Sequence, residues 1–181
     1  MKETATLFRK AIELVFNHFL ADYGFLKTKS TADKNGFSVT YRNDKRYVHL
    51  GGTLHPHDYP YYYYLSFGEG SDDFLESDWN STALWRIIQH KSPADYKKHK
   101  DLYDIPPGIT KKQIEEKILT NQKLCEIYGS AFFNNDLTEF KLVRSLQNKD
   151  REPYKIYTPD NQGKYSMSYD EQSTKLKKKY S

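Results

Sequence analysis

Four consecutive tyrosines at positions 61–64 constrain the fold of this chain more than any other feature. Aromatic residues favour extended strands, in which alternate side chains point to opposite faces of a sheet. One face of the predicted strand then carries a set that is typical of a core: Tyr61, Tyr63, Leu65 and Phe67. The other face carries Tyr62 and Tyr64, where a half-solvated sheet usually has small or charged residues. We expect this second face to be either covered by another part of the chain or used for binding.

The length and composition predict a globular domain. With 181 residues, of which 37% are hydrophobic and 15% aromatic, the chain is expected to form a sizeable, tyrosine-rich core. No apolar run approaches the roughly 20 residues that cross a bilayer, so no membrane partner is expected. The N-terminal segment has no continuous apolar stretch and no cleavage site, so we expect no signal peptide. The single cysteine, Cys125, excludes an intramolecular disulfide and fits a reducing, cytoplasmic location.

The charges are unevenly distributed along the chain. Residues 144–181 contain nine basic and five acidic residues, an excess of four that equals the net charge of the whole chain. Residues 47–85 contain no Lys or Arg and six acids, five of which cluster after the aromatic strand: Glu69, Asp72, Asp73, Glu76 and Asp78. The sequence therefore predicts an acidic loop beside the aromatic strand, and a basic footprint for nucleic acid is not its main feature.

The first half of the chain predicts one helix followed by a meander of strands. Apolar residues at three- and four-residue spacing predict a helix over residues 4–23, with Gly24 at its C-terminal cap. The side chains expected on its core face are Leu7, Phe8, Ala11, Leu14, Val15, His18 and Phe19. Four strands are expected over residues 25–31, 37–42, 46–54 and 59–67. Short turns between consecutive strands favour antiparallel pairing.

The second half predicts three helices and a hairpin. The helices are expected from about Ser81 to Gln89, from the capping box that begins at Thr110, and after Asn135 or Asp136, with a charged connector over residues 91–109. Two alternating segments around residues 154–169 predict a C-terminal hairpin. The whole pattern is that of an α+β fold, with a single domain over residues 1–174 and a basic, frayed tail over residues 175–181.

The cluster His55-Pro56-His57-Asp58 has the most catalytic appearance in the chain. Two imidazoles two residues apart on extended backbone share a face and can both bind a metal, so a metal-dependent hydrolase is one alternative. The cluster resembles the start of the His-x-His-x-Asp-His motif of metallo-β-lactamase-like hydrolases. It departs from that motif because Asp58 follows His57 directly. A polar loop that holds no metal or other cofactor is the preferred interpretation.

No catalytic residue is predicted elsewhere. Cys125 lies at an apolar position of a predicted helix with no catalytic motif around it, so we expect a buried structural cysteine. The chain contains neither a Walker A motif nor a dinucleotide-binding glycine motif. These observations favour a non-enzymatic role.

The face opposite the predicted core and the acidic loop form a candidate binding surface. Tyr and Arg dominate the binding energy of many protein interfaces. An acidic loop flanked by aromatic rings suits a basic groove on a protein partner. The predicted partner-binding residues are Arg42, Tyr47, His49, Tyr62, Tyr64, Asp72, Asp73, Glu76, Asp78 and Trp79.

The layout of the first half resembles small bacterial immunity-type proteins. The similarity rests on the helix ending Asp22-Tyr23-Gly24-Phe25, on Tyr41-Arg42-Asn43 near a turn, and on the aromatic strand that leads into the acidic loop. The resemblance implies a cytoplasmic α+β protein that neutralises a partner toxin. It carries over no functional residues.

Two other interpretations of the aromatic face stay open. Single-stranded nucleic acid stacks on such rings, and the basic residues 175–181 can contact phosphates, so a nucleic-acid binder is an alternative. The lack of Lys and Arg in residues 47–85 weakens it. The other interpretation is structural, with a C-terminal helix or hairpin covering Tyr62 and Tyr64. The solvent exposure of these two rings distinguishes a binding role from a structural one.

Overall fold

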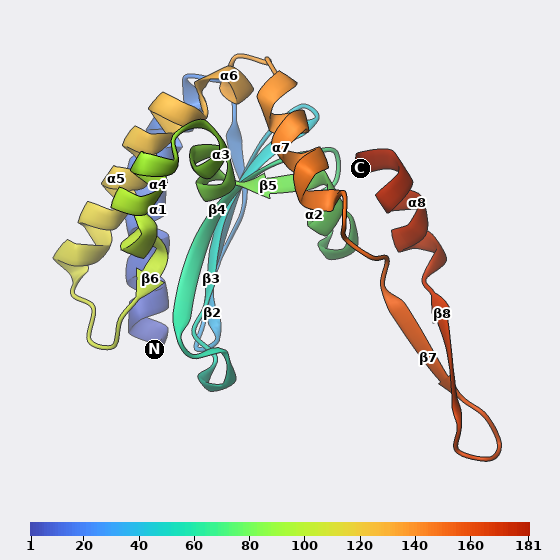
Figure 1. Ribbon diagram of the computed structural model, residues 1–181. Coiled ribbons are helices and arrows are strands. Elements are labelled where there is room, and N and C mark those ends of the chain that lie inside the picture. The colour runs from blue at the N-terminus through green and yellow to red at the C-terminus, as the bar shows by residue number, and fades with distance from the viewer.

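The computed structural model describes residues 1–181 and confirms the α+β fold (Figure 1). An antiparallel sheet has the strand order β1-β2-β3-β4-β5, and a short sixth strand pairs with the other end of β4. These strands are β1 (Leu26–Ala32), β2 (Gly36–Asn43), β3 (Arg46–Thr53), β4 (Tyr61–Glu69), β5 (Ser81–Ala83) and β6 (Asp104–Ile105). The first four strands form the predicted meander, because short connections force consecutive strands to pair antiparallel.

Helices cover one face of this sheet. The long helices are α1 (Lys2–Ala21) and α5 (Lys111–Tyr128), and shorter ones follow the sheet: α3 (Leu84–Lys91), α4 (Pro93–Lys98), α6 (Ser130–Phe133) and α7 (Thr138–Asn148). α5 begins at the predicted capping box, in which the side chains of Thr110 and Gln113 each accept a hydrogen bond from the backbone N–H of the other residue. The aromatic strand contributes Tyr63 and Phe67 to the core beneath α1 and α5. No helix contains an apolar stretch long enough to span a bilayer.

The buried face of α1 differs from the predicted one. Leu14 was expected in the core but is 76% exposed. The side chains that pack on the sheet are spaced by four residues, from Phe8 through Ile12 and Phe16 to Leu20. This stripe is the buried one because it places two phenylalanines and two large aliphatic residues on one line along the helix.

The connecting segments are more regular than the sequence predicts. Half of the acidic segment is helical, because Phe74–Asn80 forms α2 before the chain enters β5. The expected connector contains α4, the 3-10 helix η2 (Lys100–Tyr103) and β6, and another 3-10 helix, η1 (Pro56–Asp58), precedes the aromatic strand. Elements this short lack a readable hydrophobic period, since each contains two turns or fewer.

The C-terminal arm, residues 149–181, extends away from the rest of the fold before returning to it (Figure 1). The predicted hairpin is present as β7 (Lys155–Pro159) and β8 (Tyr165–Tyr169). The expectation of a frayed tail is wrong, because residues 171–180 form α8 (Glu171–Tyr180). Leu176 and Tyr180, one helical turn apart, pack with Trp79 of α2 in a small second core.

Candidate functional site

A cleft of about 690 Å³ opens on the outer face of the sheet, opposite the main core. The outward-facing side chains of β3 and β4 contribute to it, because their neighbours along each strand point into the core. The other contributions come from α2 and the loop before it, from β5, from the start of α3 and from the residues at and after the end of α7. Five of the ten predicted partner-binding residues line this cleft: Tyr47, His49, Tyr64, Asp72 and Asp78.

Three aromatic rings at and beside the cleft are open to solvent. Tyr62 and Tyr64 are 52% and 45% exposed, so the interpretation that a C-terminal element covers them is wrong. Phe74, at the start of α2, lines the cleft and is 84% exposed. Our reasoning from sequence missed Phe74, although an aromatic residue directly after two aspartates in a charged segment was a usable signal.

His49 lies against Tyr64 on the sheet. The two rings are stacked with their centroids 5.5 Å apart, and the Tyr64 hydroxyl lies 3.2 Å from His49 Nε2. His49 Nδ1 lies 2.9 Å from the Thr40 hydroxyl. Burial lowers the pKa of His49 below 6.5, and the nearby Asp72 carboxylate opposes this shift only in part. The neutral form of His49 therefore predominates at pH 7, and both ring nitrogens lie near hydroxyls that can donate or accept.

We expect His49 to make the folded state less stable as the pH falls below 6.5. Its folded-state pKa is lowered, so the unfolded chain takes up a proton first, and acidification favours unfolding until folded His49 also protonates. Urea denaturation at pH 7, 6 and 5 should therefore show a flatter pH dependence for H49Q than for the wild type. H90Q, a change at an exposed histidine, is the control. Equal pH dependence of H49Q and the wild type would contradict the assignment.

The acids that line the cleft are already paired with bases of the same chain. Asp72 lies 3.1 Å from both Arg42 and Lys29, and Asp78 is paired with Arg151. Partial burial alone would raise the pKa of Asp72, but the bonds and charges of Lys29 and Arg42 lower it overall. Asp72 is therefore ionised, and basic side chains of the same chain neutralise both Asp72 and Asp78.

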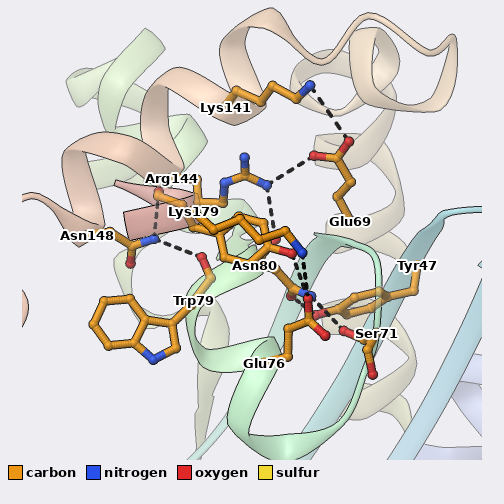
Figure 2. A network of polar contacts seen from close by, with 11 residues as sticks. Tyr47, Glu69, Ser71, Glu76, Trp79, Asn80, Lys141, Arg144, Asn148 and Lys179 are labelled. Carbon is orange, nitrogen blue, oxygen red and sulfur yellow. Dashed lines mark hydrogen bonds and ion pairs between the residues drawn. The ribbon is translucent and has the colours of Figure 1, made fainter. Parts of the chain in front are cut away.

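Two other acids of this segment, Glu69 and Glu76, are held by the C-terminal half of the chain (Figure 2). Glu69 lies 3.2 Å from Arg144 and 3.7 Å from Lys141, both on α7. Glu76 lies 3.2 Å from Lys179 of α8. Three bases of residues 144–181, Arg144, Arg151 and Lys179, thus pair with acids of this segment inside the molecule. Asp73 alone among the five clustered acids is exposed without a basic partner.

Two of the predicted partner-binding residues are buried and cannot contact a partner. Tyr47 and Trp79 are 1% and 0% exposed. The Tyr47 hydroxyl donates to Asn80 Oδ1 at 2.6 Å, and the Asn80 amide donates to the Ser71 carbonyl at 2.7 Å (Figure 2). Trp79 turns away from the cleft because α2, unrecognised in the sequence, directs it toward α8.

The structure offers no metal centre or reactive thiol at the sites considered from sequence. The rings of His55 and His57 lie 5.1 Å apart, but no group of three or more His, Cys, Asp or Glu side chains is close enough to hold a metal. Cys125 is buried, as predicted, and burial raises the pKa of its thiol well above the ordinary value. A protonated, inaccessible thiol is a poor nucleophile.

The β7–β8 hairpin carries a second uncovered aromatic surface. Directly opposed residues share a face of an antiparallel pair, and the register opposes Tyr157 to Met167 and Pro159 to Tyr165. Tyr169 lies on the same face, opposite Lys155. All residues of both strands are exposed, so nothing in the chain covers this face.

The structure thus brings five of the predicted residues to one cleft and pairs Arg42 with Asp72 of that cleft. It leaves Tyr62 and Asp73 exposed, and it holds Glu76 in an ion pair with α8. Comparison of the chain with protein-family models, with curated proteins and with solved structures found no match.

Proposed function

We propose that this protein is a non-enzymatic interaction domain that binds a protein partner through the outer face of its sheet. The observation that carries the proposal is the open aromatic surface formed by Tyr62, Tyr64 and Phe74 at and beside the cleft. Large rings that are exposed beside a concave surface suit a binding role, because each buries much apolar area while losing few rotamers. A surface patch of this kind marks an interaction site more often than a scattered apolar residue does.

The hairpin supports the same proposal. An isolated two-stranded hairpin is only marginally stable in water, and covering one face stabilises it. Its uncovered face carries three tyrosines and a methionine, residue types that are enriched at interfaces: Tyr157, Tyr165, Met167 and Tyr169. A partner that contacts this face would stabilise the arm at the same time.

The class of partner that we propose is a toxin, following the resemblance of the sequence to immunity-type proteins. Our proposal places the contact on aromatic rings more than on the acidic segment. Asp72, Glu76 and Asp78 already have basic partners, which leaves Asp73 as the free acid next to Phe74. A basic partner groove would therefore meet less negative charge than the sequence suggested.

A single-stranded nucleic-acid binder is the second candidate, favoured by one observation. Lys175, Lys177 and Lys178 of α8 have no acidic partner and follow the aromatic hairpin directly. Two basic side chains near the cleft, Arg42 and Arg151, are neutralised by acids. A mobility shift with short RNA that weakens with salt would favour this candidate, and no shift at low salt would remove it.

We expect the double variant Tyr64→Ser, Phe74→Ser to weaken partner binding about 30-fold or more, because two hot-spot rings are lost. Immobilised protein incubated with lysate of the source organism, followed by titration of any retained protein, measures this. Leu14→Ser is the matched control, since it removes an exposed apolar side chain from α1 on the opposite side of the sheet. Equal binding by all three proteins would contradict the proposal, as would the absence of any retained protein.

A further inference from the structure

One charged side chain in the cleft has no partner in the protein. Arg86, near the start of α3, is half-buried and lines the cleft, yet its guanidinium makes no ion pair and no hydrogen bond. It lies over the ring of Trp85, 4.5 Å from the ring centroid. Arg42 and Arg151, by contrast, are each paired with an acid of the cleft.

The surroundings of Arg86 leave its charge uncompensated. Asp78 is held by Arg151, and Asp72 by Arg42 and Lys29. Burial lowers the pKa of Arg86, and repulsion from the nearby Arg151 lowers it further. A guanidinium that is partly desolvated, positioned by an aromatic ring and free of carboxylates is suited to an anion from outside the chain.

We propose that Arg86 binds a carboxylate of the protein partner, so that the segment in the cleft is an acidic peptide with an aromatic or apolar residue beside the acid. This inference rests on the proposed function and specifies the chemistry of the bound segment. A guanidinium can hold a carboxylate through two parallel hydrogen bonds. Tyr64 and Phe74 line the same cleft and can pack against the neighbouring apolar side chain.

The surroundings favour a carboxylate over a phosphate. Arg86 is a single free cation, which matches the single negative charge of a carboxylate. A phosphate group carries nearly two negative charges at pH 7, which one guanidinium leaves partly uncompensated. The segment of the partner that enters the cleft is therefore acidic, whereas the acidic loop alone predicted a basic groove on the partner.

The test uses two synthetic peptides, acetyl-Gly-Glu-Phe-Glu-Gly-amide and its Gln-for-Glu counterpart, titrated into the full-length protein by NMR. We expect the Glu peptide to shift the side-chain signals of Trp85 and Arg86 saturably and to bind about five- to tenfold more tightly than the Gln peptide. Arg86→Gln should abolish this preference. Lys112→Gln should retain it, since it removes the same charge from a side chain that is 86% exposed on α5.

Each outcome separates the carboxylate site from the broader proposal. Equal affinity of the wild type for both peptides, or a preference that persists in R86Q, overturns the carboxylate site. Shifts confined to residues outside the cleft overturn it too. If the carboxylate site is overturned, the binding experiment with the Tyr64→Ser, Phe74→Ser variant still tests the proposed function independently. An unchanged backbone spectrum of R86Q verifies that the variant is folded.

Discussion

Replacing Trp79 with alanine is expected to lower the free energy of unfolding by about 3–5 kcal/mol. Its ring is fully buried between α2 and α8, where Leu176 and Tyr180 pack against it. The small second core has few other apolar side chains, so the cavity cannot be filled by neighbours. The lost stability should therefore mainly affect α8 and the hairpin, which would detach from α2, while the sheet and α1 keep their own core.

Trp79→Phe is the matched variant. The indole Nε1 of Trp79 is buried without a hydrogen-bond partner, so phenylalanine removes an unsatisfied donor while it keeps most of the packing. We expect W79F to change stability by less than about 1.5 kcal/mol. Urea denaturation measures the totals, and hydrogen exchange should show α8 amides losing protection in W79A before those of β2 and β3. Equal protection of α8 in W79A and the wild type would contradict this role of Trp79.

The regular parts of the fold were predictable because their hydrophobic period is long enough to read. The alternation in Tyr61–Phe67 correctly separates the buried side chains from the exposed Tyr62 and Tyr64. Thr110 and Gln113 mark the start of α5, because each satisfies a backbone group of the other. Both patterns depend on neighbours within a few residues, so no tertiary information is needed.

The second core and the candidate site were less predictable because both are assembled from contacts distant in sequence. Leu176 and Tyr180 are spaced as helix neighbours, but the lysines around them made the segment look like a solvated tail. Their burial depends on Trp79, about 100 residues earlier. Arg86 was overlooked for a related reason, since only the structure shows that it has no acidic partner, whereas Arg42 and Arg151 do.

The charge distribution is a second case in which contacts distant in sequence could not be predicted. An acidic segment and a basic C-terminus were both visible in the sequence, and each suggested an external partner. The structure pairs three of the five clustered acids, Glu69, Glu76 and Asp78, with Arg144, Lys179 and Arg151 of the C-terminal part, so this charge is used internally. The net charge of each segment reveals such complementarity only if the two segments are known to touch. Disrupting an ion pair between them therefore tests directly whether the acidic segment contacts the C-terminal half.

Arg144→Ala should therefore lower the free energy of unfolding by about 3 kcal/mol, near the lower end of the range for breaking a buried ion pair because Glu69 is partly solvated. Arg144 is buried, lies 3.2 Å from Glu69, and stacks over the rings of Phe140 and Tyr180. Its loss leaves Glu69 with the weaker Lys141 contact at 3.7 Å and opens the junction of α7 with α8.

A double-mutant cycle separates the charge from the packing. Glu69→Gln alone should cost about 1–2 kcal/mol, because buried Arg144 loses its counter-ion. Arg144→Met with Glu69→Gln should cost less than the losses of Arg144→Met and Glu69→Gln measured separately, since methionine keeps the stacking volume and no buried charge is left unpaired in the double variant; a coupling of about 1–2 kcal/mol is expected. The free energies come from urea denaturation at low and high salt, and salt should change the coupling little because Arg144 is shielded from solvent. Additive losses within about 0.3 kcal/mol would show that the acidic segment and the C-terminal half are not joined by this pair.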